Sequence, residues 1–405
     1  MTVYYRNSAR IEIGNSARMA SEVSARAESE KQLRVLRVAH ASLTPALRGR
    51  ERALAARFPN LALEVITTGK WHEAGVEVIA QEDDLFPVSP ARTFLTRHPQ
   101  LFAYDPRPFI NALKVFRPHL IDLNHEPYSL PCAELLLLRN IYAPNTPVIM
   151  QTAQNIPKRF PPPFSWWEQR AFRQVDAACV CSDTVRETLQ AKGFKKPVAL
   201  IPFGVDLARF KQRAVETNSS QPLTIGFVGR MLPGKGLPLL GQALQLLARE
   251  NWRALFVGDG PERASVMRQL AKYGLESRVT MTGAVDYEIV PDYLQQIDVL
   301  VVPSQTTPKL REQFGRVIVE AMASGVCVVG SDSGAIPEVI GPAGLIFPEG
   351  QPEALAECLQ KLLKAPQLRQ QLAQAGRRRV EKNYTWEKVA EKTYSFYQQV
   401  LGLRR

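Results

Sequence analysis

The chain has 405 residues, of which 45% are hydrophobic and 22% are charged. This length exceeds one ordinary hydrophobic core, so we expect a globular protein with two domains. No apolar run reaches the roughly 18 residues of a membrane-spanning helix. The first residues also lack the apolar stretch of a secretory signal. We therefore expect a cytoplasmic protein.

The net charge of +12 has two interpretations. It fits an anionic partner, such as a nucleotide or an acidic membrane surface, and it fits a solvated basic surface that keeps the protein in solution. The sequence has no zinc-finger spacing, no helix-turn-helix pattern and no basic aromatic platform. We therefore expect no nucleic-acid partner.

The five cysteines are odd in number, and four of them lie in apolar patterns. The pair in Cys179-Val-Cys181 has no second pair with which to complete a zinc site. We expect buried, reduced thiols, as in cytoplasmic proteins. The cysteines are Cys132, Cys179, Cys181, Cys327 and Cys358.

The first 30 residues differ from the rest of the chain. Asn-Ser-Ala-Arg occurs at 7–10 and again at 15–18 within a polar stretch. Such sequence cannot bury a core, so we expect a disordered tail over 1–30. Between 31 and 205, strand patterns alternate with helical ones, which predicts a parallel sheet covered on both faces. The predicted strands are 33–39, 61–67, 76–80, 119–124, 147–152, 177–181 and 198–201.

The alternation restarts after a polar linker at 206–222. We expect a second Rossmann-like domain over 223–384, and two such lobes imply a cleft between them. In open sheets of this kind, ligands bind at the carboxyl edge of the strands. The predicted strands are 223–228, 253–257, 278–282, 299–302 and 326–329.

The loop Gly229–Gly236 directly follows the first strand of the second domain and holds two cations, Arg230 and Lys235. An arginine grips a phosphate with its planar fork and a lysine adds a point charge, which favours a phosphate site. The loop lacks both the Gly-x-Gly-x-x-Gly of a dinucleotide site and the ending of a P-loop. A glycine- and proline-rich turn with two solvated cations therefore stays an open alternative.

Later strands of this domain end in further candidate positions. Gly258 and Thr282 lie in turns where a flat base has room against the backbone, although turn chemistry alone also favours glycine there. Glu312 lies in the loop after the strand at 299–302, and Glu320 lies in the first turns of the next helix. Glu320 is placed either to accept ribose hydroxyls or only to complement the helix dipole.

This ordered set resembles the retaining glycosyltransferases of family 4, also called glycosyl transferases group 1. Their fold, known as GT-B, is an α/β arrangement of two Rossmann-like parallel-sheet domains that face each other across a cleft. The resemblance extends from about residue 33 and is most specific between Gly204 and Glu338. It rests on a linker motif at 204–210, the glycine-cation loop, a Glu-x7-Glu signature and a glycine-rich turn at 334–338.

The resemblance implies a role for each motif. Arg230 and Lys235 would neutralise the leaving nucleoside diphosphate. Glu312 would hold the donor sugar together with the two amides after Gln313, and Glu320 would hold the ribose hydroxyls. A terminal helix within 385–405 would return to the first domain, which would bind the acceptor. The catalytic residues would be His125, Arg230, Lys235 and Glu312, and the donor-binding residues Gly229, Gly236, Gly258, Thr282, Phe314, Gly315 and Glu320.

The first domain resembles the family less closely. Asn124–Pro127 is similar to the His-Glu-Pro segment of phosphatidylinositol mannosyltransferases, and by that analogy His125 would contact the donor sugar near the reaction centre. An ordinary structural histidine is the alternative. The loop at 39–45 departs from the Gly-Gly loop of the family, so no ligand contact is carried over to it. His40 in this loop is a second, weaker candidate.

The predicted helix at 47–58 is unusually basic. We hypothesise that it makes a peripheral contact with an anionic membrane at the inner face, driven by the surface potential. The alternative is a solvated basic face. The arginines of this helix are Arg48, Arg50, Arg52 and Arg57.

These features predict transfer of a hexosyl group from a nucleotide-diphosphate sugar to a hydroxyl acceptor with retention of anomeric configuration. The acceptor would be a polysaccharide, a glycolipid or a small glycoside. The sequence has no Asp-x-Asp triplet, and Arg230 with Lys235 supplies the charge a metal would give, so we expect no metal and no cofactor. Two other classes stay open: a nucleotide-binding oxidoreductase, despite the missing glycine fingerprint, and a non-catalytic protein of the same fold.

Overall fold

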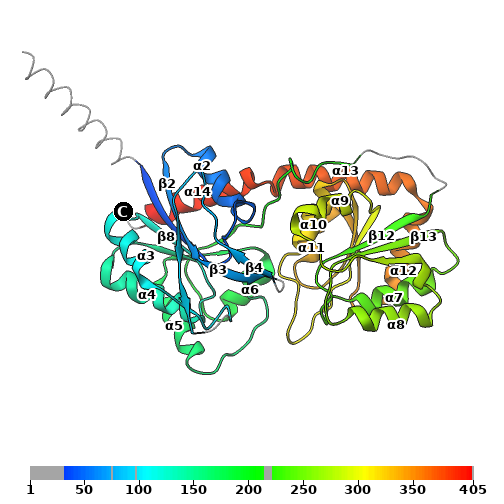
Figure 1. The fold of residues 1–405 in the computed structure, drawn as a ribbon, viewed down its shortest axis with the longest axis horizontal. Helices are drawn as coiled ribbons and strands as arrows, with labels where there is room; N and C mark the ends of the chain where they lie inside the picture. The colour runs from blue at the N-terminus through cyan, green and yellow to red at the C-terminus, as the bar shows by residue number, and fades with distance from the viewer. Residues whose placement is uncertain (1–31, 74–75, 96–97, 214–220, 404–405) are drawn as a thin grey trace, which may run out of the picture.

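The computed structural model describes residues 32–73, 76–95, 98–213 and 221–403. The predicted disordered tail at 1–30 and part of the predicted linker, 214–220, lie outside the described residues. The described chain forms two parallel sheets, each covered by helices (Figure 1). The prediction of two Rossmann-like parallel-sheet domains is therefore confirmed.

Seven parallel strands form the first sheet, and apolar residues dominate them because helices cover both faces. In spatial order they are β11 (Val198–Leu200), β10 (Ala177–Val180), β9 (Val148–Thr152), β8 (Leu120–Asn124), β1 (Leu33–Ala39), β2 (Leu61–Thr68) and β5 (Val88–Ala91). The helices of this half are α2 (Gly49–Arg57), α3 (Pro106–Asn111), α4 (Leu130–Tyr142), α5 (Phe164–Gln174) and α6 (Asp183–Ala191).

One predicted strand of this half is placed differently. Residues 76–80 do not join the parallel sheet, because β4 (Val76–Ile79) pairs antiparallel with β3 (Lys70–Glu73) in a separate hairpin. Ile79 is largely exposed there, so its apolar pattern does not mark a core strand. A second short hairpin consists of β6 (Thr93–Phe94) and β7 (Ala103–Tyr104).

Six parallel strands form the second sheet. In spatial order they are β14 (Val279–Met281), β13 (Trp252–Val257), β12 (Leu223–Val228), β15 (Val299–Val302), β16 (Cys327–Ser331) and β17 (Gly344–Phe347). The helices around it are α7 (Leu237–Leu246), α8 (Arg263–Lys272), α9 (Val290–Leu294), α10 (Arg316–Ala323), α11 (Ile336–Ile340), α12 (Pro352–Lys364) and α13 (Pro366–Asn383).

The last helix, α14 (Trp386–Gly402), connects the two halves. Figure 1 shows α13 running along the second half and α14 crossing to the first. The Tyr394 ring stacks on Phe58 at the end of α2, with ring centroids 3.9 Å apart. At its start, the Trp386 ring fills space that only glycine leaves, because a Cβ at Gly49 or Gly204 would lie within 2.4 Å of it.

A buried cluster of charges anchors α2 and α14 to the sheet. Arg37 of β1 pairs with Glu51 of α2 and, at 2.9 Å, with Asp122 of β8. Asp122 also accepts a hydrogen bond of 2.6 Å from the Tyr397 hydroxyl of α14. Burial alone would raise the pKa of Asp122, but the charges of Arg37 and Arg50 hold it below its usual value.

The basic helix at 47–58 is only partly exposed to solvent. The guanidinium groups of Arg48 and Arg50 are buried, and Arg48 donates to the carbonyls of Ser42 and Leu43. Arg52 pairs with Asp83 at 2.6 Å, and Arg57 pairs with Glu391 of α14. Arg48 and Arg50 therefore offer no charge to a membrane surface, whereas the side chains of Arg52 and Arg57 are 33% and 49% exposed. Among the described helices, none is both long and apolar enough to span a bilayer.

Tyr397→Phe removes one hydrogen bond to the buried Asp122 carboxylate and leaves the ring packing intact. We expect a loss of about 1.5–3 kcal/mol in the free energy of unfolding, as for a hydrogen bond to a charged group. Urea titration at neutral pH measures it. As the pH falls below the ordinary pKa of aspartate and then through the depressed pKa of Asp122, the wild type loses the stability that this ionised carboxylate contributes, so the difference should shrink. An unchanged midpoint would contradict this anchor.

Candidate functional site

The loops at the carboxyl edge of the second sheet meet at a change in strand order. β12 has β13 on one side and β15 on the other, so the chain reverses direction across the sheet between β12 and β15. Open α/β sheets bind ligands in the crevice outside such a point. The loop after β12 carries Arg230 and Lys235, and the loop after β15 carries Glu312.

Lys235 and Glu312 meet there directly. The Lys235 Nζ lies 2.7 Å from Oε2 of Glu312, which also accepts a hydrogen bond of 3.0 Å from the hydroxyl of Ser304. The two charged side chains are 25% and 11% exposed, so a ligand can reach them although the protein shields the pair from bulk water. Because the charges compensate each other, the pair can stay partly buried before any ligand binds.

Two glycines bring the surrounding loops together. A Cβ at Gly258 would lie 2.0 Å from the carbonyl oxygen of Gly229, so the turns after β13 and β12 touch through their backbones. A Cβ at Gly334 would lie 2.1 Å from the carbonyl oxygen of Glu312. Both glycines have positive φ, 130° and 59° respectively, which other residues rarely adopt. The predicted motifs therefore form one surface.

Glu320 lies in α10 and is buried. Its Oε1 accepts a hydrogen bond of 2.8 Å from the Tyr287 hydroxyl, and Arg316 lies 3.5 Å away. Burial raises the pKa of Glu320, and the charge of Arg316 opposes the shift. A ligand that donates hydrogen bonds to this carboxylate would stabilise its charged form, because a buried charge without hydrogen-bond partners is unfavourable.

The remaining donor-site candidates have varied surroundings. Arg230 is exposed, and among the described residues no hydrogen bond or ion pair holds its guanidinium. The Thr282 hydroxyl donates to the carbonyl of Gly283 at 2.8 Å. The Phe314 ring is buried against Phe203 of the first half, with centroids 5.4 Å apart. Gly236 and Gly315 directly precede α7 and α10 in left-handed conformations.

Asn155, which belongs to no recognisable sequence motif, links the two halves at this site. It follows β9 and is 1% exposed. Its Nδ2 donates to the backbone carbonyl of Glu312 at 2.9 Å, and Arg311 Nη1 donates back to the Asn155 carbonyl at 3.3 Å. A second link runs from the Asp183 amide to the Glu338 carboxylate at 2.8 Å.

His125 lines a separate cavity of about 280 Å³ at the carboxyl edge of the first sheet. It is 3% exposed and shares a hydrogen bond of 3.0 Å with the Tyr104 hydroxyl. Burial lowers the pKa of His125, and His40 and Arg37 lower it further, so the ring is neutral at pH 7. Arg316 of α10 also lines this cavity, which therefore borders the second half.

Neighbouring Glu126 fixes the loop that carries His125. Its carboxylate accepts from the Thr152 hydroxyl at 2.5 Å and from the Ala153 amide at 2.9 Å. Burial raises the pKa of Glu126, and these hydrogen bonds oppose the shift. The exits of β8 and β9 are thus held together beside the cavity.

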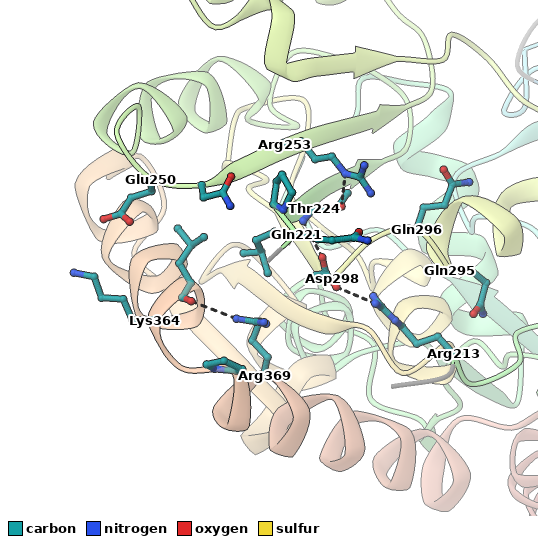
Figure 2. A pocket seen from close by; sticks show the side chains of 15 residues that line it. Arg213, Gln221, Thr224, Glu250, Arg253, Gln295, Gln296, Asp298, Lys364 and Arg369 are labelled. Carbon is teal, nitrogen blue, oxygen red and sulfur yellow. Dashed lines mark hydrogen bonds and ion pairs between the residues drawn. The ribbon is translucent and has the colours of Figure 1, made fainter. Parts of the chain in front are cut away.

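A larger cavity of about 560 Å³ lies at the opposite edge of the second sheet (Figure 2). None of the predicted site residues lines it. Arginines that line this cavity make contacts within the domain. Arg213 pairs with Asp298 at 2.9 Å, and Arg369 donates a hydrogen bond to the Leu362 carbonyl near the end of α12. Arg253 donates to the Thr224 hydroxyl at 2.9 Å.

Thiol and metal chemistry has little support in the part of the chain that the structure describes. All five cysteines are free, and four of them are buried. Burial raises the pKa of the Cys132 and Cys181 thiols to about 12. The described residues contain no group of three or more His, Cys, Asp or Glu side chains arranged to hold a metal ion.

Two Rossmann-like domains, joined through the loops at the carboxyl edges of their sheets and crossed by a returning terminal helix, are the hallmark of the GT-B class of glycosyltransferases. The family comparisons agree with this class. Glycosyl transferases group 1 matches residues 208–379, and Glycosyltransferase Family 4 matches residues 51–209. The chain belongs to this glycosyltransferase family.

Characterised relatives are similar over part of their length. A GDP-mannose-dependent monoacylated alpha-(1-6)-phosphatidylinositol monomannoside mannosyltransferase of Corynebacterium glutamicum is 31% identical over 240 residues, which are 56% of this chain and 62% of that protein. An alpha-D-kanosaminyltransferase of Streptomyces kanamyceticus is 25% identical over 58% of this chain and 63% of its own. The matches thus span less than two thirds of these relatives.

Solved structures share the fold over nearly the whole chain. A glycosyltransferase from Rickettsia africae superposes with a TM-score of 0.70 at 17% identity, covering 91% of this chain and 99% of that one. A sucrose-phosphate synthase from Thermosynechococcus elongatus has a TM-score of 0.67 at 21% identity, covering 92% and 100%. These likenesses establish the two-domain architecture.

Asn155→Ala removes the side-chain hydrogen bond from the first half to the Glu312 carbonyl, which keeps its bond from the Ala335 amide at 3.0 Å. We expect a larger radius of gyration in small-angle scattering, because one tie between the halves is lost. The free energy of unfolding should fall by about 1 kcal/mol. Asn60→Ala is the control, since it breaks a bond to Tyr394 away from the donor loops. Equal scattering from both variants would contradict the linking role.

Proposed function

We propose that this protein transfers a hexosyl group from a nucleotide-diphosphate sugar to a hydroxyl acceptor, with retention of anomeric configuration. The observation that carries the proposal is the Lys235–Glu312 pair of 2.7 Å at the change in strand order. An exposed Arg230 in the same loop adds a guanidinium that no contact among the described residues engages. Two cations beside a carboxylate suit a diphosphate joined to a polyhydroxy sugar.

In this proposal the donor binds the second domain. Lys235 and Arg230 neutralise charge as it develops on the departing diphosphate, which is the stabilisation that lowers such barriers most. Glu312 accepts hydrogen bonds from the sugar hydroxyls, and Glu320 accepts them from the ribose. Gly229, Gly236, Gly258 and Gly315 would give the backbone close access to the donor, with Thr282 and Phe314 in the same loops.

The reaction would proceed on one face of the sugar. The bond between the anomeric carbon and the phosphate oxygen breaks as the acceptor oxygen bonds to that carbon from the same side. The acceptor proton passes to the departing phosphate oxygen. A neutral His125 supports this course, because it can share a hydrogen bond with a sugar hydroxyl without adding charge beside the cation that develops at the anomeric carbon.

We propose that residues 31–205 bind the acceptor and residues 223–384 the donor, with 206–222 as linker and the helix within 385–405 returning to the first domain. The packing of α14 on α2 and the cavity beside His125 support this division. Five free cysteines support a cytoplasmic location. The relatives named above carry different sugars and acceptors in their names, so these do not choose a donor or an acceptor for this chain.

Family membership makes a nucleotide-dependent oxidoreductase the weaker alternative. A non-catalytic protein of the same fold is opposed by the intact Lys235–Glu312 pair and the buried Glu320. A thermal-shift panel of nucleoside diphosphates and nucleotide sugars tests the proposal, because a ligand that binds only the folded state raises the melting temperature. No shift with any nucleotide, together with no sugar transfer, would contradict it.

Arg230→Ala and Lys235→Ala should each slow transfer by roughly two to three decades, since losing one donor aimed at developing charge costs about 2–4 kcal/mol. The effect should fall on kcat more than on KM for the donor. Arg268→Ala, which removes an exposed cation from α8, is the matched control. Near-wild-type turnover in either site variant would remove its assigned role.

Glu320→Gln should raise stability while weakening nucleoside diphosphate binding. Because burial raises the pKa of Glu320, the wild type loses stability as the pH rises through that pKa, and glutamine avoids this loss. The variant should therefore unfold at a higher temperature at pH 7, with the gain vanishing at about pH 4. Calorimetry should show binding roughly 10- to 100-fold weaker, as for a lost charged hydrogen bond. Unchanged binding would leave Glu320 a structural residue only.

A further inference from the structure

We infer that the cavity beside His125 receives an uncharged ring bearing several hydroxyl groups, and that His40 and Gln151 select it by hydrogen bonds to those hydroxyls. The inference rests on the proposed function and narrows it: it names the chemical class of the acceptor group and two specificity-determining residues. Both residues line the cavity, His40 from the loop after β1 and Gln151 from β9.

Two buried polar atoms at this cavity have no hydrogen-bond partner among the described residues. They are Nδ1 of His40 and Nε2 of Gln151. Leaving such an atom unsatisfied costs about 1–3 kcal/mol. Buried atoms of this kind in a native structure call for an explanation. A ligand that brings hydroxyl groups into the cavity supplies the missing partners for both.

Each of the two side chains is held in a defined orientation. The Oε1 of Gln151 accepts from Nη2 of Arg37 at 3.5 Å, which leaves its amide nitrogen as the donor. The His40 ring stacks on His125 and meets Trp71 edge-on, each with centroids 5.3 Å apart. Burial lowers the pKa of His40 to about 4, so the ring is neutral and offers one donor and one acceptor. A hydroxyl group, which both donates and accepts, matches this set.

The charges around the cavity argue against a phosphate-bearing group. Three arginines line it, and each lies beside a carboxylate. Arg37 is paired with Glu51 and Asp122, and Arg50 lies 3.1 Å from Asp122. Arg316 lies 3.5 Å from Glu320 of its own helix. The charges of Arg37 and Arg50 are balanced by Glu51 and Asp122, and Glu320 offsets the charge of Arg316. Anion sites instead use arginine forks that are free for bidentate contacts.

The size and the apolar lining of the cavity fit one ring. Its volume of about 280 Å³ lies just below the range of roughly 300–1,000 Å³ found for drug-sized ligands. Leu47, Phe203 and Trp386 contribute an apolar wall against which the face of a pyranose or cyclitol can pack.

The loop that carries His40 is held in place by neighbouring contacts. His40 lies in the loop at 39–45, which departs from the Gly-Gly loop of the family. Arg48 braces this loop by donating to the carbonyls of Ser42 at 2.9 Å and Leu43 at 2.8 Å. A braced loop presents the imidazole to the cavity at a fixed place, which is what a specificity-determining contact requires.

The test measures binding of small rings by ligand-observed nuclear magnetic resonance, using myo-inositol, methyl α-glucopyranoside, methyl α-mannopyranoside and myo-inositol 1-phosphate. We expect at least one uncharged ring to bind the wild type, and the phosphate to bind no more tightly than myo-inositol. His40→Phe keeps the stacked ring but loses the nitrogens, and Gln151→Met keeps the length but loses the amide. Each should weaken binding of the uncharged ring about tenfold or more.

Two matched variants outside the cavity control for general effects: His72→Phe in the β3–β4 hairpin and Gln296→Met in the second half. Both should bind the ring as the wild type does, and melting temperatures check that all variants fold. Failure of all three uncharged rings to bind, tighter binding of the phosphate, or unchanged binding in folded His40→Phe and Gln151→Met would each overturn the inference. Nucleoside diphosphate binding, measured separately, reports on the proposed function, so the two failures are distinguishable.

Discussion

The ion pair between Lys235 and Glu312 is the interaction on which the candidate donor site depends. It joins the loops after β12 and β15 across the point where the sheet changes direction, and the Ser304 hydroxyl completes it. A partly buried ion pair contributes little net stability, because desolvation offsets most of the attraction. The ion pair instead fixes the positions of the two side chains until a ligand with a diphosphate and hydroxyl groups binds.

The backbone of Glu312 connects this pair to the other domain. Its carbonyl accepts from Ala335 within the second half and from Asn155 of the first half, while its side chain faces Lys235. A change in the separation of the halves would therefore act on the residue proposed to hold the sugar. The placement of one loop makes the donor site sensitive to where the acceptor domain lies, with no need for a mobile lid.

Local pattern was enough to predict the two sheets, because buried parallel strands are short apolar runs that alternate with helices. It was also enough for the donor motifs, which lie in loops directly after such strands. It failed where partners are distant in sequence. Arg37 and Asp122 are 85 positions apart, and the arginines of α2 appeared solvated because Asp83 and Glu391 lie far from them. Asn155 and Gln151 have no local motif, and their roles follow only from tertiary contacts.

The returning helix α14 gives the two candidate sites a common mechanical element. It continues from α13, which covers the second domain. Its Tyr397 hydroxyl donates a hydrogen bond to Asp122, whose partners Arg37 and Arg50 line the cavity beside His125. Trp386, at its first turn, lines that cavity and packs against Gly49 and Gly204. Rotation of one domain relative to the other would move the start of α14, where Trp386 packs against these two glycines. The shape of the proposed acceptor cavity and the tie at Glu312 would then change together, which couples occupancy of one site to the geometry of the other.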